Sequence, residues 1–167
     1  TALFVSGLLQ EDIGGPSVKP YMPPGIWKSI SNATYKQDHG EKLYRRSMYT
    51  YWRRTVPPPT MMAFNAAARE SCAVRNELTT TPLQALTLLN NVTFVEAARL
   101  LAERLLKAQE LATDRDRIQW AFRAITSRQP SDDEIKILQD DLARFRIDFK
   151  NRPDTAKQLL KVGEKPH

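Results

Sequence analysis

The 167-residue sequence has one cysteine, Cys72, and only two histidines, His39 and His167. A solitary cysteine excludes an internal disulfide, a CxxC redox pair, a CxxCH haem attachment site and a multi-cysteine zinc site. His39 lies in a polar stretch and His167 is the last residue, so neither is placed for metal binding or general base catalysis. We therefore expect no catalytic residue, no metal site and no cofactor in this chain, and an enzyme formed by this chain alone is the less favoured interpretation.

Long apolar runs are also missing, and no stretch approaches the length that a membrane-spanning helix needs. The formal net charge of +6 is not concentrated in one place. Residues 1–83 carry 10 basic and 6 acidic groups, which gives +4, and residues 84–167 carry 15 and 13, which gives +2. A dispersed excess does not form the cationic stripe that neutralises several phosphates at once. We expect neither a membrane span nor a nucleic-acid partner.

Proline and glycine are plentiful in the first forty residues, in the runs Gly14-Gly15-Pro16 and Pro23-Pro24-Gly25. Because proline fixes the backbone and withholds a donor, these runs predict an extended arm, which we expect Trp27 to anchor. In residues 41–55 several large side chains share one helical face, which favours a helix, although the aromatic and threonine content leaves a strand open. Residues 1–60 are thus predicted to be a proline-rich arm plus one helix.

Residues 61–80 are predicted to hold an extended piece over 61–64, a short helix over 66–74 capped by Asn65, and a linker. From residue 81 the helix signals are stronger. Thr81 is a cap and Pro82 takes the first helical position, which starts a helix over 82–89. Asn90 and Asn91 interrupt it. Further helices are predicted over 92–109, 114–127 and 154–162, and over the apolar stripe that follows the Ser131-x-x-Glu134 capping box.

The helix over 92–109 is expected to bury Phe94, Ala98, Leu101 and Leu105 and to expose Arg99, Glu103 and Lys107. Together the elements predict a mainly α fold, in which a loop- and proline-rich N-terminal part precedes an antiparallel multi-helix array over 81–162. We expect residues 1–167 to form a single domain. The chain lacks an initiating methionine and ends after VGEKP, so we interpret it as a fragment of a longer protein.

Arginines and aromatic residues form the one cluster with candidate binding chemistry. A platform for a glycan or an anion would use stacking and charge in this way. The favoured alternative is that the aromatic residues belong to the core and the arginines pair with carboxylates of a neighbouring domain. The acidic run at 132–134 is explained by the helix dipole and does not indicate a metal. The candidate interface or anion-binding residues are Arg45, Arg46, Arg53, Arg54, Arg69, Arg75, Trp27 and Trp52.

Three stretches carry a resemblance to a known family: GGPSVKPYMPPGIW at 14–27, TYKQDHGEKLYRRSMYTYWRRTVPPPTMMAFNAAARESC at 34–72 and TTTPLQALTLLNN at 79–91. They resemble a planctomycete-type domain of unknown function, number 1553. The resemblance implies the C-terminal portion of a large exported protein, periplasmic or at the cell surface, often with a cytochrome c-like domain upstream. Any haem would then belong to that separate domain. Where relatives read F-D-A-P-D-R-E, this chain has FNAAARE at 64–70, which removes two carboxylates.

Two functions follow as expectations. The first is a non-catalytic helical interaction module that packs against other domains of its extracytoplasmic parent protein. The alternative is an arginine-rich site for an anion or a glycan, contributed to an enzyme that forms with the upstream domains. The missing carboxylates at 65 and 68 weaken the enzymatic alternative.

Overall fold

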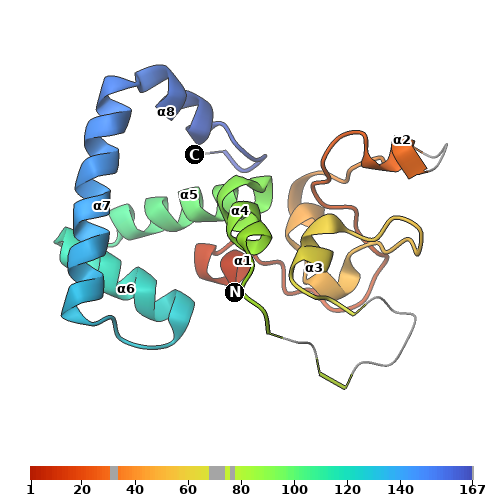
Figure 1. Ribbon diagram of the computed structural model, residues 1–167, viewed down its shortest axis with the longest axis horizontal. Helices are drawn as coiled ribbons and strands as arrows, with labels where there is room; N and C mark the ends of the chain where they lie inside the picture. The colour runs from red at the N-terminus through yellow and green to blue at the C-terminus, as the bar shows by residue number, and fades with distance from the viewer. Residues whose placement is uncertain (31–33, 68–73, 76–77, 167) are drawn as a thin grey trace. The chain divides into compact units, whose positions relative to one another are not determined.

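The computed structural model describes residues 1–30, 34–67, 74–75 and 78–166 (Figure 1). About 57% of the chain is helical, and no strand is formed within these ranges, so the prediction of a mainly α fold is confirmed. The chain divides into two compact units. We call Leu9–Val95 the proline-rich unit, and we call Thr1–Leu8 together with Glu96–His167 the helical unit.

The proline-rich unit holds its arm by backbone pairing. Isolated bridges join Gln10 to Arg45 and Val18 to Thr50. Buried apolar side chains from the arm and from residues 43–56 make the core of this unit, namely Val18, Trp27, Leu43, Tyr44 and Val56. The short elements are α2 (Ile26–Ile30), η1 (Gly40–Tyr44), η2 (Ser47–Tyr49) and α3 (Pro59–Ala63), and they are followed by α4 (Pro82–Asn90).

The single helix predicted over 41–55 is wrong, because two 3-10 turns, η1 and η2, stand there instead. The arm is the physical reason. The backbone N–H of Gln10 donates to the carbonyl of Tyr44, and Val18 exchanges hydrogen bonds with Tyr49 and Tyr51. These backbone groups are satisfied across the unit and not four residues along the chain, so an α-helix cannot continue through them.

Residues 61–64 were predicted to be extended, and this is also wrong, since α3 covers most of them. Pro59 occupies the first turn of α3, where its missing N–H costs nothing. Asn65 follows the helix with a φ of 56° and is therefore a terminating residue rather than an N-cap. The helix predicted over 66–74 falls largely outside the described residues, as do Arg69 and Cys72.

The helix starts after residue 80 are confirmed. Thr81 and Gln84 form a capping box at α4, with Pro82 at its first position, and Ser131 and Glu134 form the predicted box at α7 (Asp132–Asn151). The remaining helices are α1 (Ala2–Ser6), α5 (Val92–Lys107), α6 (Asp114–Thr126) and α8 (Pro153–Leu160). The boundary between the two units lies inside α5, after Val95.

Within the helical unit α6 lies against α7, α1 contacts α6, and α8 folds back from the end of α7 (Figure 1). Ile135 is the largest fully buried apolar side chain there. Nη1 and Nη2 of Arg146 donate to the Asp114 carboxylate, at 2.5 and 3.0 Å, and so tie α7 to the start of α6.

The predicted orientation of α5 needs a correction. Ala98, expected inside, is exposed, while Arg99, expected outside, is buried together with Glu96 and Ala97. The cause is a pair of hydrogen bonds that the spacing of apolar residues along the helix does not predict. Glu96 accepts a hydrogen bond from the backbone N–H of Lys165, and Arg99 donates to the Lys165 carbonyl. The C-terminal segment therefore lies over the polar side of α5.

Candidate functional site

Arg45 is the most heavily engaged of the candidate arginines. Its Nη2 donates to the carbonyls of Asp12 and Gly14 at 3.0 and 2.6 Å, and its Nη1 donates to the carbonyl of Pro16 at 3.2 Å. The guanidinium also stacks 3.8 Å from the centre of the Tyr49 ring, whose hydroxyl accepts a hydrogen bond from the Gly14 N–H. Arg45 thus holds the 12–16 loop in place with three hydrogen bonds inside the proline-rich unit, whereas its buried Nε has no hydrogen-bond partner among the described residues.

Trp27 belongs to the core, as expected of an anchor, with 7% of its surface exposed. Its ring lies 5.3 Å from that of Tyr35 and 6.1 Å from that of Tyr51, and the Arg53 guanidinium lies 5.2 Å above it. The indole N–H is buried, and no side chain or backbone group of the described residues accepts from it. Burial raises the pKa of the Tyr35 hydroxyl, which donates to the carbonyl of Pro20.

The other candidates are dispersed. Arg46 is exposed and lies 3.8 Å from Glu11, Arg54 and Arg75 are exposed, and Trp52 is half-buried. Arg69 lies outside the described residues. Of the predicted set, the structure therefore brings Trp27 and Arg53 together, whereas Arg45 and Arg46 engage different partners.

Sequence reasoning missed the exposed apolar surface of α4. Leu83, Leu86, Leu88 and Leu89 are exposed by 62, 57, 49 and 73%. No charged residue occurs between Leu78 and Val95. The signal was present in the sequence, since an uncharged helix with four leucines and only Gln84, Thr87 and Asn90 as polar side chains is normally buried over much of its surface. Here α4 contacts α3 and otherwise presents its leucines outward.

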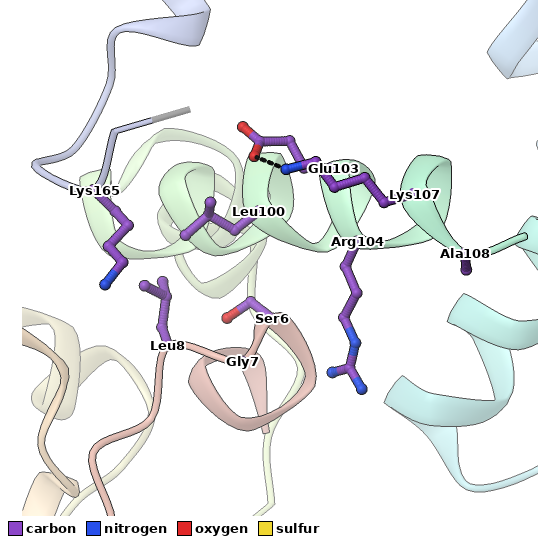
Figure 2. A pocket seen from close by; sticks show the side chains of 9 residues that line it. All are labelled: Ser6, Gly7, Leu8, Leu100, Glu103, Arg104, Lys107, Ala108 and Lys165. Carbon is purple, nitrogen blue, oxygen red and sulfur yellow. Dashed lines mark ion pairs between the residues drawn. The ribbon is translucent and has the colours of Figure 1, made fainter.

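A groove of about 510 Å³ lies in the helical unit, between the end of α1 and the C-terminal half of α5. Figure 2 shows its apolar side chains, Leu8 and Leu100, between the cationic ends of Lys165 and Arg104. The Glu103 carboxylate lies along its edge and contacts Arg99 at 3.0 Å and Lys107 at 3.8 Å. The arrangement offers an apolar surface with cations beside it, and it includes no nucleophile paired with a base.

Ion pairs at the helix starts account for the strongest electrostatic effects. Arg128 donates to both oxygens of Glu134, which lowers the pKa of that carboxyl to about 2. The hydrogen bond from Arg146 likewise lowers the pKa of Asp114. Within the described parts of the chain, no group of three or more histidine, cysteine or carboxylate side chains is placed to hold a metal. None of the helices described there is long and apolar enough to cross a membrane.

The family model named PSD1, described as a protein of unknown function (DUF1553), matches residues 1–142. The chain belongs to the DUF1553 family. Among curated proteins and among solved structures no significant match was found. The region that places the chain in DUF1553 includes the whole proline-rich unit, α6 and the first half of α7, whereas α8 and the segment that covers Glu96 follow it.

Proposed function

We propose that this DUF1553 chain is a non-catalytic helical interaction module of a larger extracytoplasmic multidomain protein, and that α4 is its docking surface. The observation that carries the proposal is the exposure of four leucines on one short helix. Contiguous apolar surface on a soluble protein marks a place where another surface docks. The extracytoplasmic location is supported only by the family resemblance of the sequence.

The polar side chains of α4 strengthen the proposal because they turn back to their own helix. Thr87 donates to the carbonyl of Leu83, and Asn90 donates to the carbonyl of Leu86. Gln84 is used in the capping box. The helix therefore offers methyl groups and few free polar groups to its surroundings, and a matching partner surface is apolar and uncharged.

The partner we propose is another domain of the same parent protein. An apolar surface between two domains of one chain is not exposed to solvent in the whole protein, because the neighbouring domain packs against it as the protein folds. The proposal also accounts for the engagement of Arg45 and Trp27 within the proline-rich unit, since those residues then support the fold and the docking surface lies elsewhere.

Thiol labelling tests the proposal directly. In the Leu89→Cys variant we expect a maleimide to react quickly with the isolated chain and much more slowly with the intact parent protein. Mass spectrometry of the labelled peptide separates this thiol from Cys72. The control is Glu110→Cys, at an exposed position between α5 and α6, which reports the general reactivity of surface thiols. Equal labelling of Leu89→Cys in both proteins would contradict a role for α4 in docking.

The alternative function is an arginine-rich anion or glycan site that this chain contributes to an enzyme formed with upstream domains. It is less well supported, because Arg45 already donates to three carbonyls of its own unit and Trp27 is buried. Exposed Arg46, Arg54 and Arg75 are the residues left to carry it. Substitution of these three by glutamine leaves docking unchanged in our proposal and abolishes ligand binding in the alternative.

A further inference from the structure

The groove of the helical unit is independent of α4 and has the features of a small-ligand site. Its volume of about 510 Å³ falls within the range of small-molecule pockets, roughly 300–1,000 Å³. It is a shallow surface groove rather than an enclosed cavity, so a ligand needs no opening of the fold to enter.

The base of the groove is apolar. Leu8 is 3% exposed, and Leu100 and Ala108 are half-buried. The nearby Ser6 hydroxyl is not available as a free donor, because it donates to the carbonyl of Leu3. A ligand that lies in the groove therefore meets hydrocarbon below it, and an aliphatic or aromatic body gains from this contact.

The charges around that base are predominantly positive. Arg104, Lys107 and Lys165 line the groove, and Glu103 is the one acidic residue among its lining side chains. Both oxygens of Glu103 already face cations, one towards Arg99 and one towards Lys107. Its negative charge is thus compensated by the protein, and the groove as a whole attracts an anion.

One cation, the Arg104 guanidinium, is held before any ligand arrives, and so is the backbone that carries Lys165. Arg104 donates to the carbonyl of Val5 at 3.1 Å and lies 5.3 Å from the Trp120 ring, so its guanidinium has a fixed direction. The backbone of Lys165 forms two hydrogen bonds: its N–H donates to Glu96, and its carbonyl accepts from Arg99. No carboxylate of the described residues pairs with the Lys165 ammonium. Binding groups that are already in place cost less entropy when a ligand arrives.

We infer that this groove binds a small amphiphilic anion, a molecule with one carboxylate or phosphate head and a short apolar body. The head lies at one end of the groove, near Lys165, and the body extends over Leu8 and Leu100 towards Arg104. Neither half of the site suffices alone: an uncharged molecule of the same shape lacks the ion pair, and inorganic phosphate lacks the apolar contact. The need for both a charge and an apolar contact distinguishes the proposed site from the general attraction between a basic protein and anions.

The test is an amide NMR titration of the full chain with octanoate, and with octanol and inorganic phosphate as the two half-ligands. We expect saturable binding of octanoate, with shift changes centred on Gly7, Leu8, Leu100 and Arg104, and much weaker binding of both half-ligands. Binding of octanol as tight as that of octanoate, or shift changes centred away from these amides, would overturn the proposal.

Two lysine variants make the test specific. Lys165→Gln removes an ammonium but keeps the backbone that Glu96 and Arg99 hold, so the fold is preserved. We expect it to weaken octanoate binding about fivefold, the effect of losing one solvent-accessible ion pair. Lys161→Gln, at the end of α8 and outside the groove lining, is the matched control and should leave the affinity unchanged. Equal effects of the two substitutions would show that only overall charge matters, and the assigned site would be wrong.

Discussion

Gly163 lies directly against the buried carboxylate of Glu96, sixty-seven positions earlier in the chain. A Cβ atom built on Gly163 would overlap Cγ, Cδ and Oε1 of Glu96. Glu96 has no exposed surface, and its Oε1 accepts from the N–H of Lys165 at 2.8 Å. The contact with Glu96 therefore holds the C-terminal segment against α5. This close approach is possible because residue 163 has no side chain.

Gly163→Ala is expected to destabilise the helical unit by about 2–4 kcal/mol, because it combines a left-handed φ of 92° with a clash against a buried side chain. Gly7→Ala is the matched control. Gly7 also has a positive φ, 78°, but a Cβ there meets nothing within 4 Å, so it should cost only about 1–2 kcal/mol. Urea unfolding followed by circular dichroism gives both values. Equal losses would show that Glu96 moves aside freely.

Arg45→Lys is expected to destabilise the proline-rich unit by about 1–3 kcal/mol. Lysine keeps the charge, but it cannot reach the carbonyls of Asp12, Gly14 and Pro16 with a planar fork while it also stacks on Tyr49. Arg46→Lys is the neighbouring control, since its exposed contact with Glu11 at 3.8 Å is worth less than about 0.5 kcal/mol. Guanidinium-induced unfolding of both variants, followed by tyrosine and tryptophan fluorescence, measures the difference.

Leu86→Gln and Leu89→Gln together are expected to change the stability of the isolated chain by less than about 1 kcal/mol, because both side chains are more than half exposed. Ile135→Ala, by contrast, empties a fully buried site and should cost about 2–5 kcal/mol. Thermal unfolding distinguishes the two. A large loss in the double α4 variant would mean that these leucines contribute to the core, and it would remove the basis for α4 as a docking surface.

The helices after residue 80 were predictable because their start signals are local. Thr81 with Pro82, and Ser131 with Glu134, satisfy donors within three residues, so the sequence alone identifies them. The first sixty residues were not predictable in the same way. Whether residues 41–55 form a helix depends on Gln10 and Val18, whose backbone hydrogen bonds go to residues more than thirty positions later in the chain. Local periodicity carries no information about that pairing.

The candidate site shows the same limit. Trp27 was identified as an anchor from its place among prolines, but the use of Arg45 as a clamp for three carbonyls requires the loop geometry around Gly14. The burial of Arg99 was predicted wrongly, because its spacing with Glu103 and Lys107 is that of surface charges on an amphipathic helix, and the burial of Glu96 was not predicted at all. Both side chains form hydrogen bonds with the backbone of Lys165, and the spacing of apolar and polar side chains does not predict such a backbone partner.

The capping box of α7 is expected to make stability depend on pH through Glu134. Both its oxygens accept from Arg128, and one also accepts from the N–H of Ser131, so its pKa falls from an unfolded value of about 4.3 to about 2 in the folded chain. Between these values the unfolded state binds more protons than the native state. The contribution of Glu134 is therefore fully present above about pH 4.3 and is lost as the pH falls towards 2.

Glu134→Gln isolates this contribution, because other carboxylates, including Asp114, also titrate in acid. The variant should be less stable than the wild type at neutral pH, and the difference in unfolding free energy should shrink as the pH is lowered from about 4.3 to 2. A carbon-13 NMR titration of the Glu134 carboxyl should give its midpoint directly. A midpoint near the unfolded value, or a stability difference that does not change with pH, would show that Arg128 and Ser131 do not hold the ionised carboxylate in solution.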